Sequence, residues 1–485
     1  MSTSQHVDVA PASPWKSSRY NLLVPIEGEG GAVYNAASGA CLDLGDRDFQ
    51  RVTSLFARGP IDFALLDDRA IELGGALLAG GFVVDASIDE LATFRERGRG
   101  TKEGGPLILT IIPTFACNLG CGYCFVGKKQ GSMSIETEDE VLAFVRRYLE
   151  EEDVPGVEVD WFGGEPLVAH KGIIRMSRKL IALCAERGVS YNAQIVTNGT
   201  LLTPEMADEL VACRVDRVQI TVDGFEDTHN QRRPWKHAER KRLPVLGAAA
   251  EARSSFAEVL RGVEAAVGRF AVRLRINVDR NNLDQVFGLL ELFDRRGWLA
   301  PEKRFYPYLA PVRDYTHAAS SGWSMSDDCG TEPYYEVQAR WIDILHARGI
   351  PVVKESLYGF PEPRSQPCGA VTARNWVIND DGTLHKCGLD MDTDERSVGK
   401  LGQVIRADNE NAKYWQGYDH FADPMCRDCR ALPLCLGGCA RDRREGRSQA
   451  VEENCEYHLK YEPGIIAQHI RLARADRHKR SPVAL

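Results

Sequence analysis

Three closely spaced cysteines, Cys117-x3-Cys121-x2-Cys124, lie on one short loop that follows an apolar, strand-like segment (LILTIIPTFACNLGCGYCF). Thiolates at this spacing can each bind a different iron of a cubane [4Fe–4S] cluster, and three of them leave the fourth iron without a protein ligand. An iron with an open position can bind and activate a small molecule, as an open zinc position does. A three-cysteine zinc site completed by a distant histidine is the alternative that these residues leave open.

Seven further cysteines lie within the 88 residues that run from Cys368 to Cys455. Seven thiols exceed the four ligands of one tetrahedral zinc site and fall one short of two complete four-cysteine sites. The chain has fourteen cysteines and a polar N-terminal segment without an apolar signal-peptide core, so metal or redox chemistry is favoured over a disulfide framework. Four cysteines stand alone: Cys41, Cys184, Cys213 and Cys329. We interpret Cys41, Cys184 and Cys213 as small buried apolar residues.

Polar and glycine-rich segments follow other strand-like stretches of the chain. Gly163-Gly164-Glu165-Pro166 comes directly after VEVDWF; its glycines permit close backbone approach, and Glu165 offers a carboxylate for a cation. Further polar candidates at strand ends are Asn198, Asp223 and Asn277. Asn-Gly and Asp-Gly are also common turn dipeptides, so Asn198 and Asp223 have a structural interpretation as well. Arg232 and Arg233 are expected to form a solvated basic turn rather than an anion site.

Alternating strands and helices must position these side chains. The predicted strands are 107–112, 157–162, 193–196, 217–222, 272–278 and 304–308. The helices predicted between them are 135–151, 172–187, 204–213, 256–268 and 283–296. Six βα units at this spacing predict an α/β fold with a parallel sheet, a partial (β/α)6 barrel that binds ligands at the C-terminal ends of its strands.

The rest of the chain is predicted to form smaller regions around this barrel. Strands at 20–25 and 32–35, with helices near 48–57, 67–79 and 88–97, predict a small winged-helix-like unit. The segment GRGTKEGG at 98–105 is expected to be a hinge. The predicted regions are a disordered tail (1–16), the winged-helix-like unit (17–100), the barrel core (101–320), a helical connector (321–367) and a metal-stapled C-terminal domain (368–485) that ends in a basic helix.

The cysteine loop and the GGEP segment together resemble the radical S-adenosylmethionine (radical SAM) superfamily. The resemblance implies that the three loop cysteines hold a [4Fe–4S] cluster, whose fourth iron is chelated by the methionine part of SAM. One electron would then cleave the sulfonium to a 5′-deoxyadenosyl radical, which abstracts a substrate hydrogen. The SAM contacts that the resemblance implies are Tyr123, Gly163, Gly164, Glu165, Pro166, Asn198, Asp223 and Asn277.

The C-terminal spacing, C-x13-G-x4-C followed by C-x2-C-x5-C-x3-C and a last cysteine, resembles the SPASM domain of radical SAM enzymes. That domain holds two auxiliary [4Fe–4S] clusters, so the resemblance implies three clusters in all. The implied ligands are Cys368, Cys387 and Cys439 for the first auxiliary cluster, and Cys426, Cys429, Cys435 and Cys455 for the second. Fully ligated members carry another cysteine shortly after the first, but here GAVTARNW follows Cys368. We expect this cluster to be open to a substrate thiolate, with a cap from Cys329 or a non-cysteine group as alternatives.

These resemblances imply a function. SPASM-bearing enzymes mostly modify peptides or proteins, and the N-terminal unit is similar to the leader-recognition elements of enzymes that mature ribosomally made peptides. We therefore expect a cytoplasmic oxidoreductase that installs a thioether, a carbon–carbon cross-link or a related bond on a precursor peptide, with an electron donor such as flavodoxin or ferredoxin. The sequence assigns no catalytic residue. A docking or stability role is the alternative for the N-terminal unit.

Two other functions are weighed against this one. A sulfatase-maturating enzyme, which oxidises a serine or cysteine to formylglycine, usually lacks the N-terminal extension. A winged-helix iron–sulfur regulator would account for the N-terminus and the clusters but not for GGEP or the barrel. The net charge of −9 opposes nucleic-acid binding, and no apolar run reaches the ~18–20 residues of a membrane span.

Overall fold

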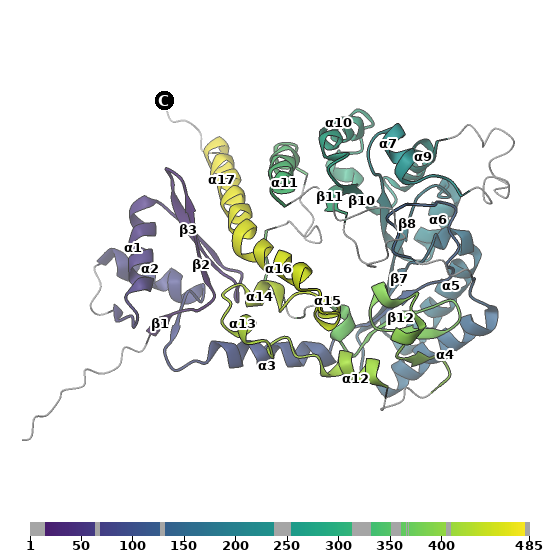
Figure 1. Ribbon diagram of the computed structural model, residues 1–485, viewed down its shortest axis with the longest axis horizontal. Helices are drawn as coiled ribbons and strands as arrows, with labels where there is room; N and C mark the ends of the chain where they lie inside the picture. Colours follow the sequence, from purple (N-terminus) through teal and green to yellow (C-terminus); the bar gives the residue numbers. More distant parts are fainter. Residues whose placement is uncertain are drawn as a thin grey trace, which may run out of the picture. The chain divides into compact units, whose positions relative to one another are not determined.

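The computed structural model describes residues 15–63, 68–126, 131–236, 254–312, 331–350, 360–364, 366, 368–403 and 409–480. The chain divides into two compact units, each built from segments that are distant in sequence. The first unit comprises Met1–Lys102, Tyr358–Cys368 and Asp419–Leu485, and the second comprises Glu103–Leu357 and Gly369–Tyr418 (Figure 1). Among the described helices, none is long and apolar enough to cross a membrane.

A nine-stranded sheet forms the centre of the second unit, in the order β11-β10-β9-β8-β7-β6-β12-β13-β14. Its strands are β6 (Leu107–Ile111), β7 (Gly156–Trp161), β8 (Ser190–Thr197), β9 (Val215–Thr221), β10 (Ala271–Val278), β11 (Phe305–Pro311), β12 (Asn375–Ile378), β13 (Thr383–His385) and β14 (Gly399–Lys400). Neighbouring strands from β11 to β12 are parallel, and β13 and β14 are antiparallel. The six predicted strands and the mostly parallel α/β sheet are confirmed.

Helices connect the parallel strands, as the sequence pattern predicts. They are α4 (Ile135–Glu151), η2 (Pro166–Ala169), α5 (His170–Arg187), α6 (Pro204–Ala212), α7 (Glu226–Arg232), α9 (Ser255–Ala266), η5 (Leu283–Gln285), α10 (Val286–Arg295), η6 (Pro301–Lys303) and α11 (Thr331–Ala347). Ser134, Thr203 and Ser254 begin three of them as N-caps, because each side chain accepts a backbone N–H of the first turn. Helix α11 lies within the predicted helical connector, 321–367, much of which is outside the described residues.

Strand β12 comes from the C-terminal part of the chain, yet it extends the sheet of the barrel. Its residues pair with β6 from Asn375↔Ile108 to Ile378↔Ile111. Trp376 packs edge-on against Phe144 of α4, with ring centroids 5.8 Å apart. The elements that accompany β12 in this unit are η9 (Gly369–Val371), η10 (Gly388–Asp390), η11 (Asp394–Arg396) and α12 (Glu410–Gly417).

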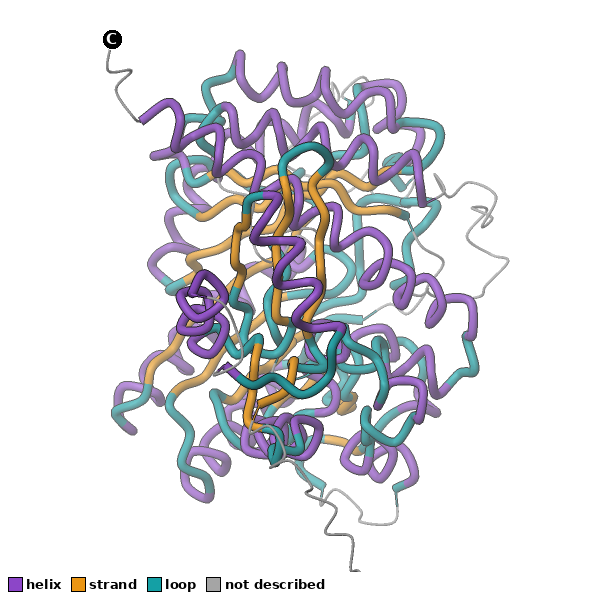
Figure 2. The backbone as a smooth tube through the Cα atoms, turned by 90° about the vertical axis from the view of Figure 1, so that its left-hand side faces the viewer, coloured by secondary structure: helices purple, strands orange, loops and turns teal. Residues whose placement is uncertain are grey.

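An antiparallel sheet, in the order β2-β3-β4, forms the centre of the first unit, and Figure 2 looks onto this unit with helices packed over its strands. The N-terminal elements are β1 (Trp15–Ser17), β2 (Asn21–Ile26), β3 (Gly30–Asn35), β4 (Cys41–Leu44), α1 (Asp46–Ala57), α2 (Asp68–Ala79), β5 (Val83–Asp85) and α3 (Glu90–Glu103). The C-terminal elements are α13 (Pro424–Arg427), α14 (Leu432–Cys435), α15 (Ala440–Arg444), α16 (Ser448–Glu456), the π-helix η12 (Tyr457–Tyr461) and α17 (Glu462–Arg480).

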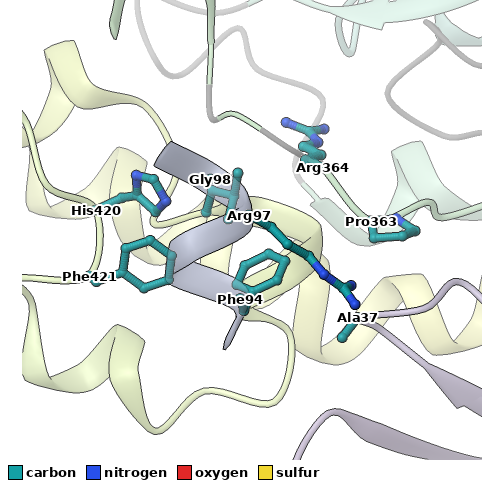
Figure 3. Close-up of a pocket in the computed structure, with 9 residues that line it drawn as sticks. Ala37, Phe94, Arg97, Gly98, Pro363, Arg364, His420 and Phe421 are labelled. Atoms are coloured by element: carbon teal, nitrogen blue, oxygen red, sulfur yellow. The ribbon is translucent and has the colours of Figure 1, made fainter. Parts of the chain in front are cut away.

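The N-terminal and C-terminal segments of the first unit share one hydrophobic core. Leu22 and Tyr34 of the sheet belong to the same buried cluster as Leu432 and Ile466. Helix α17 also contacts strands β2 and β3. A cavity of about 270 Å³ lies where α3 meets the C-terminal segment, and Figure 3 shows its lining residues. These are Ala37, Phe94, Arg97, Gly98, Pro363, Arg364, His420, Phe421 and Leu436.

Three local predictions about the N-terminal region are wrong. Trp15 and Lys16 belong to β1, which pairs with β5, so the described end of the predicted disordered tail is ordered; residues 1–14 lie outside the described residues. Helix α3 continues through Glu103, so most of the predicted hinge is helical. A glycine inside a helix costs only about 1 kcal/mol and does not have to end it. Cys41 is exposed on edge strand β4, whereas Cys184 and Cys213 are buried as predicted.

Candidate functional site

The cysteine loop follows β6 and is bound to the loop that follows β7. The N–H of Gly164 donates to the carbonyl of Thr114 at 3.1 Å, and the N–H of Glu165 donates to the carbonyl of Ala116 at 2.8 Å. Gly163 has a φ of +132°, and a Cβ there would lie 2.5 Å from the carbonyl oxygen of Thr114. Two glycines are therefore required at this point because the two loops meet backbone to backbone.

The Glu165 side chain connects the loop after β7 to the end of the neighbouring strand β8. It is fully buried and accepts three hydrogen bonds, from the N–H of Leu167 (3.0 Å), the hydroxyl of Thr197 (2.7 Å) and the N–H of Asn198 (2.7 Å). Burial raises the pKa of this carboxyl, and the three donors act in the opposite direction. In the structure Glu165 fixes the loop after β7 to the end of β8.

Asn198 extends this network to the first cysteine. Its Nδ2 donates to Asn118 at 2.7 Å and lies 3.8 Å from the Sγ of Cys117. The N–H of Leu119 also donates to that sulfur, at 3.4 Å. Asn118 in turn donates to the hydroxyl of Thr200 at 2.8 Å. Donors that point at a cysteine sulfur are typical of iron–sulfur sites, where they stabilise the thiolate.

A second buried network surrounds Tyr123. Its hydroxyl donates to Asp223 and accepts from Arg233 at 2.7 Å and from Asn277 at 3.1 Å. Asn277 also donates to Asp223 at 3.1 Å. Burial raises the pKa of Tyr123 well above its usual value, although the positive charge of Arg233 opposes the shift. Three residues that the sequence predicts separately, at the ends of β9 and β10 and on the cysteine loop, thus lie together.

The expectation that Arg232 and Arg233 form a solvated turn is wrong. They are only 2% and 7% exposed. Arg232 bonds to Asp279 at 2.5 Å, and its guanidinium lies over the ring of Tyr123 at 5.6 Å from the centroid. Two buried carboxylates, Asp223 and Asp279, compensate the two guanidinium groups, which explains why this basic pair can leave water.

The three loop thiols form a donor set that a cubane iron–sulfur cluster can use. Each is close enough to another to act on its pKa electrostatically, and burial raises the pKa of Cys117 to about 11 and of Cys121 to about 12. Among the described residues, no three His, Cys, Asp or Glu side chains converge as ligands of one metal ion. A cubane binds each thiolate through a different iron. Metal binding must displace their protons.

Six of the seven C-terminal cysteines belong to the first unit. Cys426, Cys429, Cys435 and Cys455 act on one another electrostatically, and Cys368 acts on Cys439. Burial raises the pKa of Cys426, and the nearby guanidinium of Arg443 is the largest opposing influence. Cys387 belongs to the second unit, and Cys329 lies outside the described residues.

Comparison with known proteins agrees with this geometry. The model of the "Radical SAM superfamily" matches residues 111–268, which contain the cysteine loop, GGEP and the strand ends that carry Asn198 and Asp223. The chain is a radical SAM enzyme. It is similar to the serine-type anaerobic sulfatase-maturating enzyme of Klebsiella aerogenes, at 23% identity over 67% of this chain and 77% of the relative. It is also similar to the cysteine-type enzyme of Clostridium perfringens, at 24% identity over 72% of this chain and 93% of the relative.

Solved structures show the same fold. The structure of "native anSMEcpe with bound AdoMet and Cp18Cys peptide" matches with a TM-score of 0.55 and 20% identity. The match covers all of that chain but 77% of this one, so nearly a quarter of the radical SAM enzyme described here has no counterpart in it.

Some residues of the radical SAM site are missed by reading the sequence. Asn118 lies inside the cysteine motif, His229 lies on the short helix α7, and Asp279 lies in the loop that follows β10, and neither of these last two belongs to a recognisable pattern. His229 is fully buried and its Nδ1 accepts the N–H of Asp223 at 3.2 Å. Burial, with the charge of Arg233, lowers the pKa of His229 to about 3, so its ring is neutral at pH 7. The signal that could find Asp279 is its place directly after β10, at the edge where the other polar residues gather.

Proposed function

We propose that this radical SAM enzyme modifies a ribosomally made precursor peptide, whose leader binds to the N-terminal part of the first unit. The observation that carries the proposal is the additional sheet β2-β3-β4. Among the described strands, its outer strands β2 and β4 each pair only with β3. An extended leader can add to such an edge, where main-chain hydrogen bonds give affinity and side-chain pockets give specificity. The proposal includes the winged-helix-like arrangement that the sequence predicts for this N-terminal part.

The proposed chemistry takes place at the C-terminal ends of the barrel strands. When bound, the loop cluster and SAM supply a radical that removes hydrogen from the substrate. Cys117, Cys121 and Cys124 would hold the irons. Glu165 keeps the loop that follows β7 in place, and the buried Arg233 offers positive charge beside Tyr123 for an anionic group such as a carboxylate.

We expect the purified chain to hold about twelve irons and twelve sulfides, because the SPASM-like cysteines would add two four-iron clusters to the first. Cys368, Cys387 and Cys439 would serve the first auxiliary cluster, with its fourth position open to a substrate thiolate. The measurement is iron and sulfide analysis after anaerobic reconstitution. Stoichiometric zinc with about four irons would instead indicate one cluster and zinc sites, and the SPASM assignment would fail.

The substrate class is tested with the short peptides encoded next to the gene. Anaerobic incubation of such a peptide with the enzyme, SAM and dithionite should change its mass by the loss of two hydrogens if a cross-link forms. The change should require the leader portion. An enzyme that cleaves SAM but leaves every neighbouring peptide unchanged would contradict the peptide-maturase proposal.

Sulfatase maturation is the second candidate, and the names of the two relatives favour it. The part of the chain without a match counts against it, because 72% of this chain already covers 93% of the Clostridium perfringens relative. A synthetic peptide that carries a sulfatase cysteine motif distinguishes the two candidates. Formylglycine in that peptide would establish sulfatase maturation, whereas the first proposal expects no product from it.

A further inference from the structure

Arg443 of helix α15 binds directly to one of the clustered C-terminal cysteines. Its Nη2 lies 3.1 Å from the Sγ of Cys426, and its Nε donates to the carbonyl of Gly437 at 2.5 Å. Cys426 is only 5% exposed, so little water competes for the sulfur. The guanidinium is therefore a positively charged group in direct contact with this thiol.

Asp423 holds both partners of this contact. Its carboxylate accepts from Nη1 of Arg443 at 2.5 Å and, as the N-cap of α13, from the N–H of Met425 at 2.9 Å. Helix α13 carries Cys426. One carboxylate thus fixes the cysteine-bearing helix and the arginine to each other, so the contact between Nη2 and sulfur is preorganised. A flexible surface arginine would gain little from such a contact, because ordering its side chain costs entropy.

We propose that Arg443 raises the reduction potential of the second auxiliary cluster through its hydrogen bond to Cys426. This inference rests on the proposed ligation of that cluster by Cys426, Cys429, Cys435 and Cys455. Reduction adds negative charge to the cluster and its cysteine sulfurs, and a cationic donor stabilises the reduced form more than the oxidised form. Groups that bind to metal ligands commonly tune the metal in this way.

The test is a redox titration of the full-length, anaerobically reconstituted protein, followed by electron paramagnetic resonance and paired with iron analysis. Arg443→Gln should keep the wild-type iron content and shift one reduction step to lower potential. Arg443→Lys keeps the charge but loses the forked geometry, so its shift should be smaller and in the same direction. Arg430→Gln is the matched control, because Arg430 follows Cys429 directly but is exposed. It should leave every step unchanged.

The outcomes separate this inference from the proposed function. A wild-type protein with only about four irons would remove the auxiliary clusters themselves. Full iron content with identical potentials in the wild type and in Arg443→Gln would overturn the role of Arg443 and leave the clusters intact. If Arg443→Gln loses about four irons, the reduction potential of Arg443→Lys decides whether Arg443 tunes the cluster. A wild-type potential in that variant would mean that Arg443 is structural only.

Discussion

Alanine at Cys117, Cys121 and Cys124 together should abolish the reductive cleavage of SAM and lower the iron content by about four per chain. The three thiols are the cysteines that the structure places beside the GGEP loop, where backbone hydrogen bonds join the two loops. The auxiliary cysteines are on other segments, so their clusters should remain. The measurement is 5′-deoxyadenosine after dithionite reduction, without any peptide.

Cys184→Ala is the matched control for this triple variant. Cys184 is a buried cysteine of α5 in the same unit, and nothing in the described structure places it at the strand ends. It should retain both cleavage and iron. Production of 5′-deoxyadenosine at the wild-type level by the triple variant would show that another site performs the cleavage.

Ile466→Ala should destabilise the first unit by about 2–5 kcal/mol, the range for truncating a buried isoleucine. Ile466 lies in α17, is fully buried and belongs to the same core as Leu22 and Tyr34. Amide hydrogen exchange should therefore rise in residues 21–35, far away in sequence, and binding of a fluorescent leader peptide should weaken.

Leu459→Ala provides the comparison for that variant. Leu459 belongs to the preceding π-helix and is 41% exposed, so the free energy of unfolding should change by no more than about 0.5 kcal/mol. Faster exchange confined to α17 in Ile466→Ala would show that the two ends of the chain are not energetically coupled.

Local sequence signals account for the barrel and for much of its site. Helices such as α4 and apolar strands such as β6 and β7 lie within a few residues of where the pattern predicts them. Parallel strands bring their C-terminal ends to one edge, which is why Asp223 and Asn277, 54 residues apart, could be expected near each other and do form a hydrogen bond.

Other features depend on contacts that no local pattern specifies. Arg232 looks like a surface residue until Asp279, 47 positions later, neutralises it. The short apolar segment of β12 is consistent with many placements, and only its pairing with β6 selects one. Helix α3 continues through two glycines because its apolar face, including Phe94, packs against Phe421 of the C-terminal segment. Tertiary contacts outweigh propensity in each case.

The shared core of the first unit has a consequence for synthesis of the protein. Tyr34 is made more than 400 residues before Ile466. At about 5–20 residues per second, translation takes roughly 20 to 90 s to supply the second half of that core. Meanwhile the nascent chain exposes the sheet face that carries Leu22 and Tyr34, a surface suited to chaperones that bind apolar segments. Conditions that slow the ribosome should therefore reduce the yield of folded enzyme before any iron is inserted.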